Sequence, residues 1–296
     1  MTASLHHFVA NEGEARRLAS ALGIAGKAVE LRHFPDGESL VRVSDASPTA
    51  LLYCSLDHPD AKLVQVLLAA SALRDLGANR VVLIAPYLGY MRQDQAFTPG
   101  EAVSQRVIGG IIASAFDALV TVDPHLHRTP SLDSVVPGIV AINVSAAATI
   151  AQAIAAIVAP NTILVGPDAE SRPWVEAVAA PLGLDVMIGA KVRRGDRNVE
   201  IELPDKHRAS GRPVMLVDDL ISSGGTLITC ARQLLDAGAT HVGAVATHCL
   251  AGESDLETLA ASGISPLLAT DTVPGTAACI QMALALAEAI QANGFA

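Results

Sequence analysis

The chain has 296 residues, with 20 Lys and Arg against 30 Asp and Glu, which gives a net charge of −10 at neutral pH. This length fits one large domain or two ordinary domains, each big enough to bury a hydrophobic core. The acidic balance argues against a nucleic-acid-binding surface and fits an enzyme whose phosphorylated ligands are met by local groups.

The cysteines and the apolar stretches indicate the cellular setting. Cys54, Cys230, Cys249 and Cys279 lie far apart, without the spacing of a zinc site or the density of a disulfide scaffold, so we expect a cytoplasmic protein. The start, Met-Thr-Ala-Ser-Leu-His-His, lacks the features of a signal peptide. Residues 135–166 carry no charge, but polar residues and a proline interrupt them, so we expect a buried helix between strands rather than a membrane span.

Apolar strand-like runs alternate with helical patterns along the chain. The expected strands cover residues 5–9, 51–54, 81–85, 119–122, 139–142, 163–165, 186–188, 214–217 and 242–247. The expected helices cover residues 14–22, 61–76, 103–115, 146–158, 173–182, 225–237 and 277–292. This βα alternation predicts an α/β protein with parallel sheets flanked by helices. A restart near residue 144 predicts two domains, 1–144 and 145–296, with a closing helix that can pack back on the first domain.

Residues 34–38 read Phe-Pro-Asp-Gly-Glu and lead into an expected strand at 39–43. Taken alone, they fit an ordinary Pro-Asp-Gly turn. Further on, Tyr-Leu-Gly-Tyr-Met-Arg-Gln-Asp follows the strand at 81–85. Arg92 can bind phosphate oxygens through its fork of donors, and Gln93 can supplement it, although a solvated polar loop is the alternative.

Two further polar segments, Asp-Pro-His-Leu-His and Pro-Asp-Ala-Glu, also follow apolar strands. If their side chains converge at one sheet edge, they can hold a divalent ion, and Mg²⁺ prefers such oxygen ligands. The candidates are Asp123, His125, Asp168 and Glu170. A zinc site at His125 and His127 lacks a third ligand nearby, and a histidine bonded to the backbone is the simpler alternative.

Residues 190–201 predict two β segments joined by a charged tip that contains glycine. Lys191 and Arg193 share one strand face by the period of two, so they can form a flap that moves over bound phosphates. An exposed basic hairpin is the alternative.

The strand expected at residues 214–217 leads into Asp218 and Asp219, a loop and a helix that Gly238 ends. Small residues in the loop let the backbone approach an anion, and the helix N-terminus adds positive charge, so the loop predicts a phosphate cradle. Acids at the carboxyl end of a strand accept hydrogen bonds from hydroxyls, which favours a sugar phosphate. A solvated Asp-Asp turn before a glycine-rich loop is the alternative. The loop reads Ser222, Ser223, Gly224, Gly225 and Thr226.

This stretch resembles the phosphoribosyl-binding signature of the type I phosphoribosyltransferase fold. The ordered motifs as a set resemble the ribose-phosphate pyrophosphokinase family over nearly the whole chain. They are Phe-x-Asp-Gly-Glu at 34–38, Pro-Tyr-x-x-Tyr-x-Arg-Gln-Asp at 86–94, Asp-x-His at 123–125, Pro-Asp at 167–168, Lys-x-Arg at 191–193 and the cradle at 218–226.

The resemblance implies two type I phosphoribosyltransferase-like domains, of which only the second keeps the sugar-phosphate loop. The strand at 81–85, which lacks an acid pair and a glycine loop, fits this asymmetry. The implied reaction transfers the diphosphoryl group of MgATP to ribose 5-phosphate. The implied site residues are Phe34, Asp36 and Glu38 at the adenine across a subunit interface, Arg92, Gln93 and Asp94 on the nucleotide side, His125 and Asp168 near Mg²⁺, Lys191 and Arg193 as the catalytic flap, and 218–226 at the sugar phosphate.

The chain departs from the family pattern at Gln95, Pro124 and Glu170. A nucleotide site built at a subunit interface implies a homo-oligomer. We expect neither nucleic-acid nor membrane partners. Two other functions stay open: a phosphoribosyltransferase that consumes phosphoribosyl pyrophosphate, and a non-catalytic regulatory paralogue. The sequence leaves open the oligomer size, regulation by phosphate or ADP, the nucleotide donor and the exact acceptor.

Overall fold

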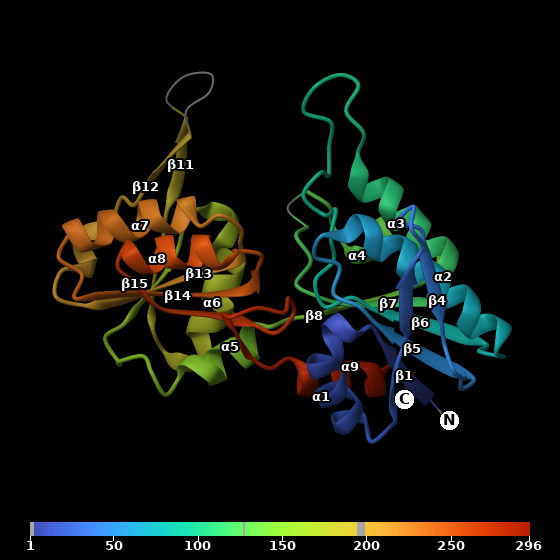
Figure 1. The fold of residues 1–296 in the computed structure, drawn as a ribbon. Coiled ribbons are helices and arrows are strands. Elements are labelled where there is room, and N and C mark those ends of the chain that lie inside the picture. The colour runs from blue at the N-terminus through green and yellow to red at the C-terminus, as the bar shows by residue number, and fades with distance from the viewer. Residues whose placement is uncertain (1–2, 127, 194–198) are drawn as a thin grey trace. The chain divides into compact units, whose positions relative to one another are not determined.

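The computed structural model describes residues 3–126, 128–193 and 199–296, and for residues 191–193, 199 and 200 it describes the backbone alone. The chain forms two compact units (Figure 1). The N-terminal unit contains Met1–Ser145 and Met282–Ala296, and the C-terminal unit contains Ala146–Gln281.

The N-terminal unit is built on a six-stranded parallel sheet in the order β2-β1-β5-β6-β7-β8. Every residue of β5 and β7 is buried, as expected for strands covered on both faces. Its elements are β1 Ala3–His7, η1 Val9–Asn11, α1 Glu12–Leu22, β2 Gly26–Ala28, β3 Glu30–His33, β4 Ser39–Arg42, β5 Thr49–Tyr53, α2 Pro59–Asp75, β6 Arg80–Ile84, α3 Ser104–Ala115, β7 Ala118–Val122, α4 Leu132–Val135, β8 Val140–Val144 and α9 Ala283–Ala292.

The C-terminal unit has a second six-stranded parallel sheet, in the order β10-β9-β13-β14-β15-β16. The two sheets confirm the expected α/β class. The elements of this unit are α5 Ala147–Ile154, β9 Ile163–Gly166, η2 Ala169–Ser171, α6 Arg172–Ala179, η3 Ala180–Leu182, β10 Asp185–Ile188, β11 Ala190–Arg193, β12 Val199–Glu202, η4 Lys206–Ala209, β13 Pro213–Ile221, α7 Gly225–Asp236, β14 His241–Cys249, α8 Glu253–Ala261, β15 Ile264–Thr270 and β16 Ala278–Ile280.

The two units repeat one topology. In each, the first strand is followed by an edge strand and an antiparallel hairpin, and the chain then returns to the other side of the first strand. The hairpin β3–β4 therefore corresponds to β11–β12, and β5 corresponds to β13. The comparison of β13 with the strand at 81–85 was wrong, because that strand is β6 and its counterpart is β14.

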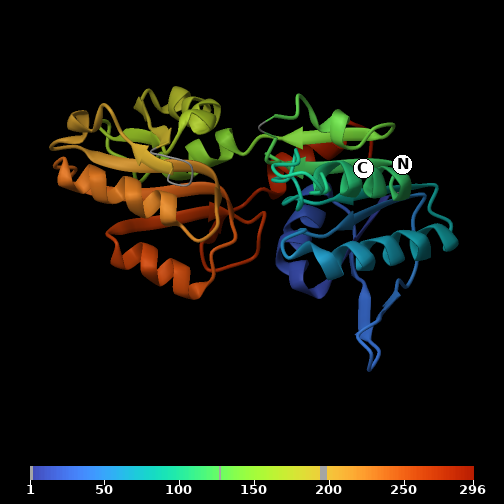
Figure 2. The same cartoon turned by 90° about the horizontal axis from the view of Figure 1, so that it is seen from above.

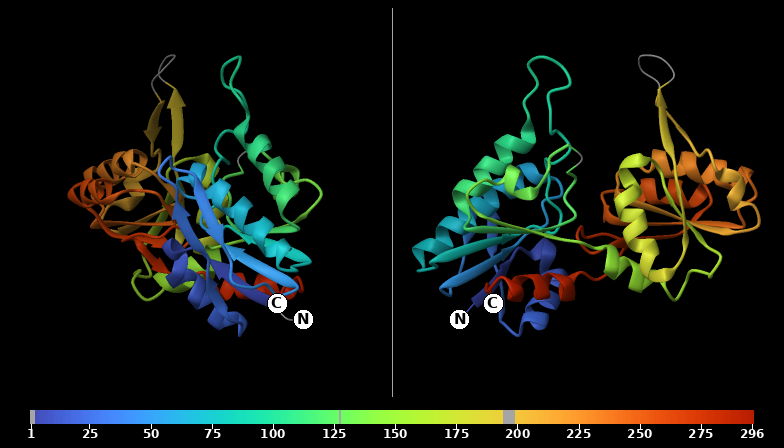
Figure 3. Two further views of the ribbon diagram at one scale, coloured as in Figure 1. Left: turned by 45° about the vertical axis from the view of Figure 1, so that its right-hand side comes forward. Right: turned by 180° about the vertical axis from the view of Figure 1, so that it is seen from behind.

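The closing helix is shorter than the sequence predicts. The alanine-rich run was expected to be helical from residue 277, but residues 278–280 form β16, which pairs with β15 at the sheet edge. Helix α9 starts at Ala283 and packs against α1 and β8 of the N-terminal unit (Figure 3). The chain thus leaves the N-terminal unit, forms the C-terminal unit and returns.

The uncharged stretch at residues 135–166 forms β8, α5 and β9, which is the expected helix between strands. Within the described part of the chain, no helix has the length and apolar character needed to cross a membrane.

Candidate active site

The predicted cradle follows β13, the third strand of its sheet in chain order. This strand is longer than the sequence predicts, because it pairs with β14 as far as Ile221 and Cys249. Asp218 and Asp219 therefore lie within the paired strand rather than after it. The loop from Ser222 to Gly224 then enters α7 directly.

The backbone amides of the loop are potential hydrogen-bond donors. In the part of the chain that the structure describes, the amides of residues 222–226 donate to no other group. Gly224, which caps α7, has a φ of 76°, and a Cβ there would lie 2.6 Å from the Leu259 side chain of α8. This position therefore requires glycine. Free amides at the start of a twelve-residue helix are suited to an anion.

Three acids gather beside this loop. Asp219 is 7% exposed and Asp218 is half-buried. Burial, together with the nearby carboxylates of Asp219 and Asp168, raises the pKa of Asp218 well above its ordinary value. Asp168 follows β9, the strand beside β13, so the predicted metal ligand and the predicted sugar-binding acids share one sheet edge.

Asp168 also has a structural role. Its Oδ1 accepts hydrogen bonds from the amides of Glu170 and Ser171, at 2.9 and 3.2 Å, and so caps η2. Glu170 is exposed on this turn. The cap fixes the orientation of the Asp168 carboxylate.

The other predicted metal ligand, His125, belongs to the N-terminal unit and is half-buried. It follows Asp123, whose φ of 32° is unusual for a residue other than glycine. His127 lies outside the described residues. Among the residues described, no group of three or more His, Cys, Asp or Glu is placed to hold a metal by itself.

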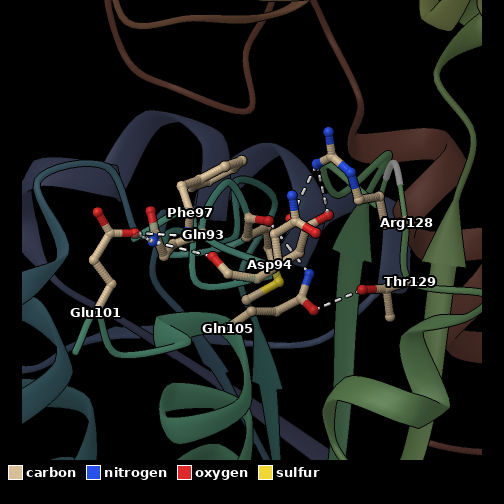
Figure 4. Close-up of polar contacts among 9 residues, drawn as sticks. Gln93, Asp94, Phe97, Glu101, Gln105, Arg128 and Thr129 are labelled. Atoms are coloured by element: carbon tan, nitrogen blue, oxygen red, sulfur yellow. Dashed lines mark hydrogen bonds and ion pairs between the residues drawn. The ribbon is translucent and has the colours of Figure 1, made fainter. Parts of the chain in front are cut away.

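The Arg-Gln-Asp segment lies between β6 and α3 (Figure 4). Arg92 is exposed, and its guanidinium has no polar partner among the described residues. Gln93 donates to Gln95 O at 3.2 Å and to Glu101 at 3.3 Å. The Asp94 side chain, which is 4% exposed, forms an ion pair with Arg128 at 3.2 Å.

Two residues that the sequence did not suggest hold this segment. The Glu101 carboxylate accepts the amides of Phe97 and Thr98, at 2.8 and 3.1 Å, and these bonds lower its pKa. Gln105 donates to Met91 O at 3.3 Å. Such contacts carry no periodic signal in the sequence, so only the fold reveals them.

Residues 34–38 form the tip of the hairpin β3–β4, which projects from the body of the N-terminal unit (Figure 2). Phe34 N donates to Glu38 O at 2.8 Å, and Glu38 N donates to Asp36 Oδ1 at 3.2 Å. These bonds define a tight turn and leave the Phe34 ring 48% exposed. The tip is ordered by its own contacts, while its aromatic side chain is available to a ligand or a partner.

The predicted flap forms the antiparallel hairpin β11–β12. Lys191 pairs with Ile201 and Arg193 with Val199, so the two basic residues occupy alternate positions of β11. The tip at residues 194–198 lies outside the described residues.

The N-terminal counterpart of the cradle has different chemistry. After β5, helix α2 begins with Pro59 at its first turn and Asp60 close behind, and Lys62 pairs with Asp57 at 2.6 Å. Pro59 removes a donor, and Asp60 repels anions. A cavity of about 510 Å³ nearby is lined mainly by apolar residues, including Phe8, and lacks all the predicted site residues.

Comparison with known proteins identifies the family. Residues 5–115 match the family model described as the N-terminal domain of ribose phosphate pyrophosphokinase, and residues 139–260 match the phosphoribosyl transferase domain. The chain belongs to the ribose-phosphate pyrophosphokinase family. Both matches agree with the resemblance based on the sequence motifs.

Individual ribose-phosphate pyrophosphokinases match most of the chain. The ribose-phosphate pyrophosphokinase of Methanopyrus kandleri is 37% identical over 279 residues, which cover 93% of this chain and 94% of that protein. The enzyme of Pyrococcus abyssi is 34% identical, covering 83% of this chain and 84% of its own. The crystal structure of phosphoribosylpyrophosphate synthetase from Mycobacterium smegmatis matches with a TM-score of 0.84 and 26% identity, covering 99% of both chains.

Proposed function

We propose that this chain transfers the β,γ-diphosphoryl group of ATP to the 1-hydroxyl of ribose 5-phosphate, which gives phosphoribosyl pyrophosphate and AMP. This is the reaction of the family to which the chain belongs. The observation that carries the proposal is the loop at residues 222–226, whose five amides have no partner among the described residues and lie beside Asp218 and Asp219. A bare polyphosphate site has no need of neighbouring acids, whereas a sugar phosphate does.

The cradle binds the 5-phosphate, and the acid pair binds the ribose hydroxyls. The free amides of the loop donate to the phosphate oxygens, and the α7 N-terminus adds positive potential. Asp218 and Asp219 then accept hydrogen bonds from the 2- and 3-hydroxyls. Two such contacts fix the ring, which positions the 1-hydroxyl for attack.

The N-terminal unit binds the nucleotide. The exposed guanidinium of Arg92, which has no polar partner in the described part of the chain, supports a phosphate or adenine contact, and Glu101 holds Gln93 beside it. The exposed Phe34 ring offers a stacking surface for a base. Asp36 and Glu38 shape the turn that presents this ring.

The residues at the β9 and β13 edge also fit Mg²⁺. Asp168 supplies carboxylate oxygens, which Mg²⁺ uses together with water and phosphate oxygens. Bound Mg²⁺ supplies charge neutralisation at phosphate oxygens, and His125 is a second candidate ligand.

Lys191 and Arg193 stabilise the negative charge that develops as the diphosphoryl group is transferred. Lys191→Ala is therefore expected to lower kcat by on the order of 100-fold or more, with little change in KM for ribose 5-phosphate. Lys206→Ala, which removes an exposed lysine from η4 of the same unit, serves as the matched control. An unchanged kcat for Lys191→Ala in an AMP-release assay would remove the flap from the mechanism.

One assay tests the proposed function. The purified chain is incubated with Mg²⁺, ATP and ribose 5-phosphate, and AMP and phosphoribosyl pyrophosphate are quantified by chromatography. Equal amounts of both products are expected, and neither should form without ribose 5-phosphate. Absence of both products would favour a regulatory paralogue, and nucleotide synthesis from phosphoribosyl pyrophosphate and a base would favour a phosphoribosyltransferase.

The exposed Phe34 at a projecting tip also supports a homo-oligomer in which the tip completes a neighbouring nucleotide site. Light scattering coupled to size exclusion should then give a mass above that of one chain. A monomer with full activity would exclude this arrangement.

A further inference from the structure

Arg128 lies in the segment that follows β7 and is firmly attached to the Arg-Gln-Asp segment. The neighbouring Thr129 hydroxyl donates to Gln105 Oε1 at 2.6 Å, while Gln105 Nε2 donates to Met91 O at 3.3 Å. Gln105 N also donates to Gln93 O at 3.2 Å. The backbone at Arg128 is therefore held beside the Arg-Gln-Asp segment (Figure 4).

The side chain of Arg128 is oriented by two groups. Its Nη1 donates to both carboxylate oxygens of Asp94, at 3.2 and 3.4 Å. Its guanidinium carbon lies 5.9 Å from the centre of the Phe97 ring. A carboxylate as buried as Asp94 is costly without a counter-charge, so this pair is expected to persist.

The same geometry leaves part of the guanidinium free. Arg128 is 52% exposed, and its Nε and Nη2 have no acceptor in the described ranges. A planar fork held at one corner by a carboxylate and on one face by an aromatic ring still offers an edge for an oxyanion.

The sequence shows why a second cation is needed here. After Arg92, no Lys or Arg occurs until Arg106 on α3. A nucleoside triphosphate carries several negative charges, and Arg92 alone is a weak match for them. Arg128 brings a positive charge to the same segment from a different part of the chain.

We propose that Arg128 binds the polyphosphate of the nucleotide and that Asp94 is its positioning residue rather than a ligand contact. The inference rests on the proposed function and adds a nucleotide-binding residue to it.

The test compares Arg128→Ala, Arg128→Lys and Asp94→Asn with the wild-type chain in the AMP-release assay. Arg128→Ala should raise KM for ATP on the order of 10-fold or more and leave KM for ribose 5-phosphate near the wild-type value. Arg128→Lys keeps a partner for Asp94, and thus the fold, but lacks the remaining fork, so it should also raise KM for ATP. Arg106→Ala, which removes an exposed arginine from α3, is the matched control.

Three outcomes would overturn the inference. One is a wild-type KM for ATP in the two Arg128 variants. Another is a larger increase for Asp94→Asn than for Arg128→Ala, because Asp94 would then contact the nucleotide itself. The third is an equal loss of affinity for ATP and for AMP as a competitor, which would place the contact away from the polyphosphate. A wild-type chain that makes no AMP would overturn the proposed function instead.

Discussion

Adjacent glycines in the cradle differ in what they require. Gly224 has a left-handed φ and lies against Leu259, whereas a Cβ on Gly225 would meet no atom within 4 Å. The fold therefore requires glycine at position 224 but not at position 225. At Gly225, we expect the missing side chain to let a ligand approach the backbone closely.

Gly224→Ala should destabilise the chain by roughly 2–5 kcal/mol, because it adds both backbone strain and a clash with α8. Gly225→Ala is the matched control and should leave stability nearly unchanged, since Ala is the better helix former. Thermal unfolding of both variants measures the difference. Equal melting temperatures would mean that α8 moves away at no cost.

Asp218 makes the stability of the chain depend on pH. Its folded-state pKa is raised, so the wild type is destabilised at neutral pH and gains stability as the pH falls through that pKa toward 3.8, the ordinary value for an aspartate. Asp218→Asn should therefore raise Tm at pH 7 to 8, and this gain should disappear at low pH. Each kcal/mol corresponds to roughly 2–4 °C in a domain of this size.

Asp236→Asn, at the exposed end of α7, is the control for Asp218→Asn. A gain that is independent of pH would argue against carboxylate repulsion as its cause. The same substitution should weaken the binding of ribose 5-phosphate. The carboxylates that repel one another in the empty site are stabilised when the ligand binds to them.

At the scale of elements, apolar runs locate most strands of the two sheets and miss the shortest ones. All nine expected strands exist, within a few residues, including the edge strands β8 and β10, which are only partly buried but still carry apolar runs. The short edge strands β2 and β16 and the proline-containing β15 carry no such signal. Helices α4 and α8 were also missed, because one is a single turn and the other is only weakly amphipathic.

The candidate site also has parts that the sequence predicts and parts that it does not. Loops attached to buried strands, such as the cradle, could be predicted because their glycine and acid chemistry is local. The Asp94–Arg128 pair could not, because it joins residues that are 34 positions apart. Its partners meet only through the parallel pairing of β6 and β7.

Strand β1 contains a second pH-dependent group. His6 is 1% exposed and contacts Ser4 Oγ at 2.9 Å. Burial, with a smaller effect of Lys27, lowers its pKa from 6.5 to about 4. The neutral ring thus contributes stability above pH 6.5, and this contribution is lost as the pH falls toward 4.

His6→Gln should remove this dependence. Between pH 7 and pH 4, the wild type should lose about 3 kcal/mol more of its unfolding free energy than the variant, since one pH unit corresponds to about 1.4 kcal/mol. Denaturant titrations at several pH values give the comparison. Parallel curves for the two proteins would show that burial does not lower the pKa of His6.

At the scale of the whole molecule, one topology has been used twice with different chemistry. The loop after β13 has free amides and acids, while the loop after β5 leads to Pro59, Asp60 and a neutralised Lys62. The corresponding hairpins also diverge, one ending in Phe34 and the other containing Lys191 and Arg193. The two units thus share one topology but carry different residues at corresponding positions.

The N-terminal unit depends on α9. Leu286, Ile290 and Phe295 are buried there, and each contributes roughly 1.5–3 kcal/mol. Removing residues 282–296 should therefore unfold the N-terminal unit and leave the C-terminal unit folded, since the loss is comparable with the stability of a whole domain.

Limited proteolysis with mass spectrometry checks this expectation, with protection confined to residues 146–281. Leu284→Ala is the control, because that side chain is 72% exposed. Protection of residues 1–145 in the truncated chain would show that α9 is dispensable.

The return of α9 also bears on synthesis. The last strand of the C-terminal unit, β16, is complete at Ile280, whereas the N-terminal unit lacks a helix until Ala292 has been made. During translation, the second unit therefore has all of its parts first. Its maturation can precede that of the first unit on the ribosome, the reverse of the N-to-C order that successive domains usually follow.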